Sequence, residues 1–118
     1  MVIDSSISEP LELLHIDLYG LLTVASLHHK KYILVIIDDF THFTWVFFFR
    51  LKFETPQILI NFIKDREIQI KLPVRRIRSD NGTEFTNYPL NSFLVSKGIT
   101  HNFSAPYTPQ QNGVVGRR

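Results

Sequence analysis

Apolar and polar residues alternate early in the chain and then give way to unbroken apolar runs. From residue 11 to residue 19 the alternation has period two, which predicts a β-strand that ends at Gly20. Residues 31–38 form a continuous β-branched run, which is typical of a central strand buried on both faces. Residues 43–51, which are rich in aromatic side chains, predict a third strand. Because short links join these three strands, we expect an antiparallel meander.

Helical spacing replaces this pattern in the middle of the chain. Thr55 and Pro56 predict the start of a helix, with Thr55 as the N-cap and Pro56 at the first helical position. Apolar residues then recur at helical spacing. Because Pro73 prevents continuation, we expect this helix to end at about Lys71.

A second helix is predicted between two short strands. Residues 74–79 predict a fourth strand, which should be parallel to one of the others because a helix separates them. Leu90 and Leu94 mark a helix that Gly98 ends as a left-handed cap, and residues 99–103 predict a fifth strand. The order βββαβαβ predicts an α/β fold with a mixed sheet and helices on its faces, which is the order of the ribonuclease H-like fold.

The two ends of the chain differ in composition from this sheet-forming part. Residues 1–10 predict a tail or linker, and residues 11–118 predict a single domain. From residue 104 to residue 113 the Pro, Gln, Asn and Gly content predicts a loop. Val114 and Val115 then resemble the first turn of a helix that the chain does not complete. We therefore expect a domain that is truncated at its C-terminus.

Composition narrows the possible classes of function. With 118 residues and 44% hydrophobic content, the chain fits one globular domain. The formal net charge of +2 and the pI of about 9.0 permit nucleic-acid binding, and arginines cluster at residues 75–78 and 117–118. The absence of cysteine excludes disulfides and cysteine-ligated zinc within this chain. Without a long apolar run or a signal peptide, the sequence predicts an intracellular protein with no membrane partner.

Aspartates in or beside the predicted strands are the candidates for chemistry. Asp17 lies inside the first strand, and it is either satisfied by nearby backbone N–H groups or acts as a metal ligand or catalytic acid. Asp38 and Asp39 follow the second strand, where a role in the turn is favoured over catalysis. Asp80 ends the fourth strand, just before a turn at Gly82. If the first and fourth strands are neighbours, Asp17 and Asp80 converge at one end of the sheet.

Five stretches of the chain, taken in combination, resemble one known protein family. They are Leu11-Glu12-Leu13-Leu14-His15-Ile16-Asp17-Leu18-Tyr19-Gly20, Asp38-Asp39-Phe40-Thr41 with Trp45-Val46, Ile77-Arg78-Ser79-Asp80-Asn81-Gly82-Thr83-Glu84-Phe85, Gly98-Ile99-Thr100-His101, and Ser104-Ala105-Pro106-Tyr107-Thr108-Pro109-Gln110-Gln111-Asn112-Gly113-Val114-Val115. In this combination they resemble the catalytic core of retroviral-type integrases, specifically the copia-like branch of retrotransposons. The resemblance covers nearly the whole chain from Leu11 on.

The resemblance implies metal-dependent phosphoryl transfer for DNA integration, in which 3′-end processing is followed by strand transfer. Such enzymes hold two divalent metals, Mg²⁺ or Mn²⁺, on an Asp, Asp, Glu triad. Carboxylate oxygens suit these hard cations, and paired metals stabilise both the attacking and the leaving oxygens. Asp17 and Asp80 match the first two positions of the triad.

The third position of the triad departs from the family pattern. It follows Asp80 by 116 − 80 = 36 residues and is occupied by Gly116, which has no side chain to bind a metal. Glu84 is the nearest acid, but the resemblance gives that position a common Glu that coexists with the triad. The sequence therefore predicts an inactive core with weak binding of a single metal at best, and it leaves open whether the chain is an enzyme.

The resemblance also implies DNA partners, namely the ends of the element and the target DNA. Gln110, Gln111 and Asn112 match the loop beside the DNA, and Arg117 and Arg118 would add positive charge. It further implies a homodimer, although the dimer-forming helices would lie beyond the chain, and a nuclear location. The alternative interpretation is a non-catalytic, DNA-binding remnant of a decayed element.

Overall fold

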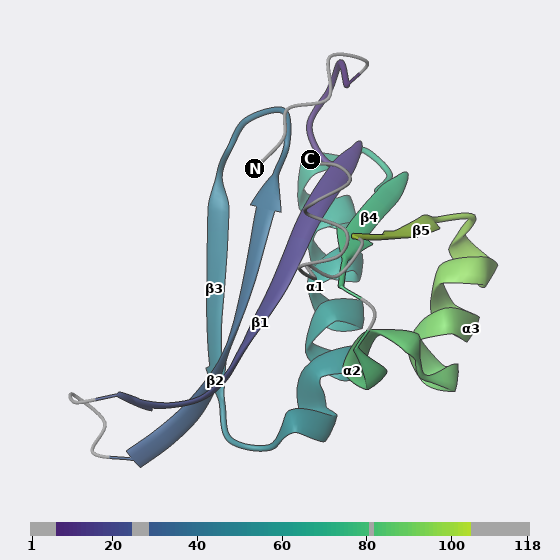
Figure 1. Ribbon diagram of the computed structural model, residues 1–118. Helices are drawn as coiled ribbons and strands as arrows, with labels where there is room; N and C mark the ends of the chain where they lie inside the picture. Colours follow the sequence, from purple (N-terminus) through teal and green to yellow (C-terminus); the bar gives the residue numbers. More distant parts are fainter. Residues whose placement is uncertain (1–6, 25–28, 81, 105–118) are drawn as a thin grey trace, which may run out of the picture.

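A five-stranded mixed sheet organises the computed structural model, which describes residues 7–24, 29–80 and 82–104 (Figure 1). The elements in chain order are β1 (Leu13–Val24), β2 (His29–Asp38), β3 (Thr44–Phe49), the 3-10 helix η2 (Lys52–Glu54), α1 (Thr55–Ile70), β4 (Arg76–Ser79), α2 (Thr83–Thr86), α3 (Tyr88–Lys97) and β5 (Thr100–Phe103). The predicted order βββαβαβ is therefore confirmed, with the two short helices η2 and α2 in addition. No helix in the described part of the chain is long and apolar enough to cross a membrane.

The strand order places β1 at the centre of the sheet. The order is β3-β2-β1-β4-β5, in which β1, β2 and β3 form the predicted antiparallel meander while β4 and β5 run parallel to β1 (Figure 1). The first and fourth strands are thus neighbours, which was the condition for Asp17 and Asp80 to converge. Leu13 pairs with Arg76, Leu14 with Ile77, and His15 with Arg78.

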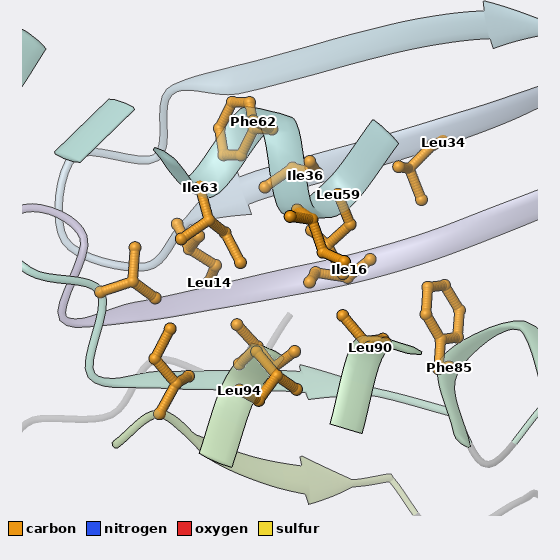
Figure 2. Packing of buried hydrophobic residues seen from close by; sticks show 14 of the residues in the cluster. Leu14, Ile16, Leu34, Ile36, Leu59, Phe62, Ile63, Phe85, Leu90 and Leu94 are labelled. Carbon is orange, nitrogen blue, oxygen red and sulfur yellow. The ribbon is translucent and has the colours of Figure 1, made fainter. Parts of the chain in front are cut away.

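One face of the sheet packs against the helices. Alternate residues of β1 and β2 contribute buried side chains to the core, because successive side chains of a strand point to opposite faces. Helices α1 and α3 and the short α2 supply the other side of the same cluster (Figure 2). The labelled core residues are Leu14, Ile16, Leu34, Ile36, Leu59, Phe62, Ile63, Phe85, Leu90 and Leu94.

The opposite face of the sheet carries His15, Asp17 and Tyr19, which alternate with the core residues of β1. Tyr19 on β1 pairs with Ile33 on β2, which in turn pairs with Phe48 on β3, so all three lie on this face. Tyr19 and Phe48 are both exposed, so within the described ranges this face presents large apolar side chains to solvent. Asp17 therefore lies on the side of the sheet away from α1.

Strand β1 is longer than the sequence predicts. Gly20 does not end it, because pairing with β2 resumes at Leu22 and continues to Val24. Between the Tyr19–Ile33 and Leu22–Lys31 pairs, β1 advances three residues (22 − 19) while β2 advances two (33 − 31). The extra residue is a β-bulge, which is a common role for a glycine inside a strand.

The two long helices follow their sequence signals with one correction. The N-cap of α1 is Glu54 and not Thr55, whose hydroxyl instead donates to the carbonyl of Lys52 at 2.7 Å. The helix ends as expected beside Lys71, which adopts the left-handed conformation with φ of 63°. In α3, the predicted cap at Gly98 is confirmed, with φ of 71°.

Residues 7–10 contact the rest of the domain. Ile7 is buried, Ser8 donates its backbone N–H to Glu12, and Glu9 lies 3.9 Å from the Arg75 guanidinium. The boundary between tail and domain at residue 10 stays a prediction.

Candidate active site

Asp17 on β1 and Asp80, which directly follows β4, occupy matching positions along two neighbouring strands. The three residues of β1 that pair with β4 each face the residue 63 positions later (76 − 13), and the same offset separates Asp17 from Asp80 (80 − 17). The ladder ends at His15 and Arg78, so the two aspartates lie two residues beyond its last pair. Both are exposed. Strand pairing therefore brings together the two residues that the sequence singled out.

Electrostatics link the same two side chains. The pKa of the Asp17 carboxyl is raised above its ordinary value, first by partial burial of the carboxyl and second by the negative charge of Asp80. The nearby His15 opposes the shift. Among the described residues, no hydrogen bond or ion pair reaches the Asp17 carboxylate. Within the described part of the chain, His15 only partly offsets the effects of burial and of Asp80 on this carboxylate.

Asp80 is oriented by the turn that follows β4. Its Oδ1 accepts a hydrogen bond from the backbone N–H of Gly82 at 3.1 Å, which closes a local turn of the kind aspartate favours. Gly82 then serves as the N-cap of α2. A Cβ at Gly82 would lie 2.4 Å from a carboxylate oxygen of Glu84, so a larger residue there would have to displace the end of the Glu84 side chain.

Ser79 contacts both the backbone of Asp80 and the ring of His101. The Ser79 side chain is buried, and its Oγ lies 3.0 Å from the carbonyl oxygen of Asp80 and 2.6 Å from Nε2 of His101. Burial lowers the pKa of His101, and its Nδ1 is buried without a hydrogen-bond partner within the described part of the chain. The sequence analysis missed both residues. The available signal was the position of Ser79 beside Asp80, with His101 on a strand that could pair with β4.

Asp38 and Asp39 have the structural role that their position in a turn predicts. Asp38 Oδ2 accepts from the backbone N–H of Leu11 at 3.1 Å, and Oδ1 accepts from that of Phe40 at 3.0 Å. Asp39 Oδ1 lies 2.7 Å from Nε2 of His15, which ties the end of β2 to β1. Both carboxylates are engaged in holding the chain together.

Glu84 does not join the two aspartates. Its side chain is only 9% exposed and pairs with Lys52 at 3.4 Å. The pair lies along an open groove of about 500 Å³ between the start of α1 and the start of α3. The residues that line this groove are Lys52, Phe53, Pro56, Gln57, Thr83, Glu84, Asn87 and Pro89.

Asp17 and Asp80, two of the residues expected to bind the metal, lie among the described residues. Both have the hard carboxylate oxygens that Mg²⁺ and Mn²⁺ prefer, and both lie just beyond the last β1–β4 pair. Across residues 7–24, 29–80 and 82–104, no group of three or more His, Asp or Glu side chains could hold a metal ion. The other predicted site residues, which are Gln110, Gln111, Asn112, Gly116, Arg117 and Arg118, lie outside the described residues.

Comparisons with known proteins agree on one family. Residues 8–109 match the family model described as "Integrase core domain". The chain is 36% identical over 109 residues to the retrovirus-related Pol polyprotein from transposon TNT 1-94 of Nicotiana tabacum, and this match covers 91% of the chain and 8% of the relative. It is 31% identical over 111 residues to the Pol polyprotein from transposon RE2 of Arabidopsis thaliana, with 94% of the chain and 7% of the relative covered.

More distant matches extend to yeast and to a viral complex. The Ty1-NL2 Gag-Pol polyprotein of Saccharomyces cerevisiae is 29% identical over 114 residues, which covers 92% of the chain and 6% of the polyprotein. The chain thus spans less than a tenth of these curated relatives. A chain of the simian T-cell lymphotropic virus intasome in complex with PP2A regulatory subunit B56 gamma superposes with a TM-score of 0.66 at 20% identity, covering 91% of this chain and 36% of that one. This likeness establishes the fold.

Proposed function

Since the chain belongs to the integrase core domain family, in its copia-like retrotransposon branch, we propose that Asp17 and Asp80 are two acids of a phosphoryl-transfer site. In this proposal the domain is part of a Pol polyprotein and derives from an enzyme that inserts DNA. The observation that carries the proposal is the convergence of two exposed carboxylates across the β1–β4 pair, where the charge of Asp80 helps to raise the pKa of Asp17.

The side chains of this site differ in how they are held. Asp17 projects from the middle of the central strand, so its position is fixed by the sheet itself. The carboxylate of Asp80 accepts a hydrogen bond from the N–H of Gly82, and its backbone carbonyl accepts one from the hydroxyl of Ser79. Divalent ions bound here would stabilise in-line attack on a DNA phosphodiester. The aspartates would act by presenting oxygens at fixed positions, with no proton transfer of their own.

In this proposal the site lacks its third acidic ligand. Position 116, where the family pattern has its third acid, is glycine, and Glu84 is committed to Lys52. Two carboxylates bind a divalent ion less tightly than three, so we expect weak binding of one metal and no strand transfer. Calorimetric titration with Mn²⁺ tests this directly. Tight occupancy by two ions would contradict the predicted defect.

Restoring the missing acid tests metal binding and strand transfer separately. Gly116→Glu should strengthen Mn²⁺ binding, because it returns a carboxylate to the third position. In a chain continued with the matching sequence of a related polyprotein, it should also restore metal-dependent strand transfer on a labelled duplex. A folded, repaired protein that binds metal but stays inert would place the lesion elsewhere in the domain.

DNA is the partner that this function requires, and the nucleus is the compartment that fits it. Arginines at positions 75, 76, 78, 117 and 118 would supply contacts to phosphates, and an intasome contains a structural relative of the domain. Binding to a fluorescent duplex should weaken steeply between 50 and 200 mM salt, at the scale typical of phosphate contacts. Salt-dependent binding without any metal effect would favour the alternative of a non-catalytic remnant.

A homodimer also belongs to the proposal, and sedimentation of the chain tests it.

A further inference from the structure

The Ser79 hydroxyl lies between two groups that compete for its single proton. Its oxygen is 3.0 Å from the carbonyl oxygen of Asp80, which can only accept, and 2.6 Å from Nε2 of His101, which can donate or accept. A hydroxyl donates one hydrogen bond and accepts others. Therefore, if Ser79 donates to the Asp80 carbonyl, Nε2 of His101 must carry the proton that Ser79 accepts.

The surroundings of His101 favour that arrangement. Nδ1 is buried and has no hydrogen-bond partner among the described residues. A buried N–H without a partner is rarer in proteins than a buried acceptor without one. The ring is also packed against Phe103, with their centroids 4.2 Å apart, which fixes its direction. The proton of the neutral imidazole is thus expected on Nε2, where Ser79 can accept it.

From these contacts we propose that His101 is a positioning residue for Asp80: its Nε2–H donates to Ser79 Oγ, whose own proton is thereby directed to the Asp80 carbonyl. The chain of two hydrogen bonds fixes the peptide that follows Asp80. On the other side, Gly82 N–H fixes the Asp80 carboxylate. Asp80 is then held through both its backbone and its side chain.

The opposite tautomer would release Asp80. With the proton on Nδ1, Nε2 becomes an acceptor, and the Ser79 hydroxyl donates its hydrogen bond to Nε2. The Asp80 carbonyl then loses its donor, and the buried Nδ1–H has no acceptor among the described residues. The position of one proton on His101 therefore decides whether Asp80 is held.

The first test requires no variant and no metal. Ring ¹⁵N chemical shifts of His101 distinguish the two neutral tautomers, and we expect the protein to show the Nε2–H form at pH 7. Observation of the Nδ1–H tautomer, or of an even mixture, would overturn the proposal. A structural role in packing alone would not require either tautomer.

Matched variants test the consequence for Asp80. His101→Gln keeps an N–H donor that can reach Ser79, whereas His101→Leu fills similar space without any donor. We expect increased amide mobility at Asp80 and Gly82 in His101→Leu and in Ser79→Ala, but wild-type mobility in His101→Gln. Unchanged signals from β2 and β3 would show that each variant is folded. If His101→Gln loosens the turn as much as His101→Leu does, packing and not donation is what matters.

A Mn²⁺ titration connects the inference to the proposed function, on which it rests. Loss of an outer hydrogen-bond partner typically weakens metal binding about 10- to 100-fold, and we expect the lower end for His101→Leu, with recovery in His101→Gln. If wild-type protein binds no Mn²⁺ while the tautomer and mobility results hold, the proposed metal site fails and the positioning role stands. If Mn²⁺ binds equally well to all variants, the positioning role fails and the metal site stands.

Discussion

Two pairs of aspartates lie at the same sheet and behave in opposite ways. Asp38 and Asp39 are 1% and 2% exposed, and their carboxylates accept hydrogen bonds from the backbone and from His15. Asp17 and Asp80 are exposed, and the charge of one raises the pKa of the other. Sequence context hardly separates the pairs, since three of the four residues end a strand or begin a turn.

The difference shows how each pair relates to stability. A buried carboxylate is tolerated only when hydrogen bonds compensate for its lost hydration, so Asp38 and Asp39 are part of the architecture. Two like charges held close together oppose folding, and such an arrangement is typical of a functional site. We therefore expect substitutions in the first pair to destabilise the domain and substitutions in the second pair to leave it intact or more stable.

The largest expected effect is at Asp38. Asp38→Ala leaves the backbone N–H groups of Leu11 and Phe40 without their acceptor, and Leu11 is a buried residue with φ of 68° that depends on this contact. We expect the free energy of unfolding to fall by about 3 kcal/mol. Urea denaturation measures the loss, and Asp80→Ala serves as the matched control. Equal midpoints for the two variants would remove the distinction between the pairs.

Asp39→Asn should have the next largest effect. The substitution replaces a charged acceptor 2.7 Å from His15 with a neutral amide at a buried position. A loss of about 2 kcal/mol follows from weakening a hydrogen bond to a charged group. The same denaturation series detects it, with Asp17→Asn on the neighbouring strand as the control. A cost at position 17 as large as that at position 39 would argue against a purely structural role for Asp39.

His101 should make the domain sensitive to mild acid. Burial lowers the pKa of His101 in the folded state below its ordinary value of 6.5. Between those two pKa values the unfolded chain binds more protons, so stability falls as the pH drops below about 6.5 and levels off below the folded pKa. Thermal unfolding across this range should show the decline in wild-type protein and a flatter profile in His101→Gln. The same slope in both proteins would assign it to another group.

The smallest effect should be a gain in stability at the candidate site. Because the pKa of Asp17 is raised in the folded state, its ionised form opposes folding above that pKa, and the penalty vanishes below the ordinary value of 3.8. Asp17→Asn should therefore stabilise the domain at pH 7 by less than about 1 kcal/mol, since the group is partly screened by solvent. In Asp80→Asn, carboxyl ¹³C NMR should show the Asp17 pKa moving down toward its ordinary value. An unchanged Asp17 pKa would mean that the two charges do not interact.

Sequence patterns predicted the strands and helices, and the chain order alone suggested that Asp17 and Asp80 could meet. The predicted end of the first strand at Gly20 was wrong. A glycine can mark either a strand end or a bulge, and only the pairing with β2 decides between them. Helix α2 is four residues long, which is too short to show a period. The contact between Ser79 and His101 joins residues 22 positions apart, and only the pairing of β5 with β4 brings them together.

Paramagnetic NMR with Mn²⁺ tests the central claim, that Asp17 and Asp80 form a metal site while Asp38 and Asp39 do not. The ion broadens the signals of nuclei close to it, and all four aspartates report within one experiment. Broadening should centre on residues 17 and 80, spare residues 38 and 39, and disappear in Asp17→Asn. Broadening that centres on Asp38 and Asp39, or that persists in Asp17→Asn, would contradict the account.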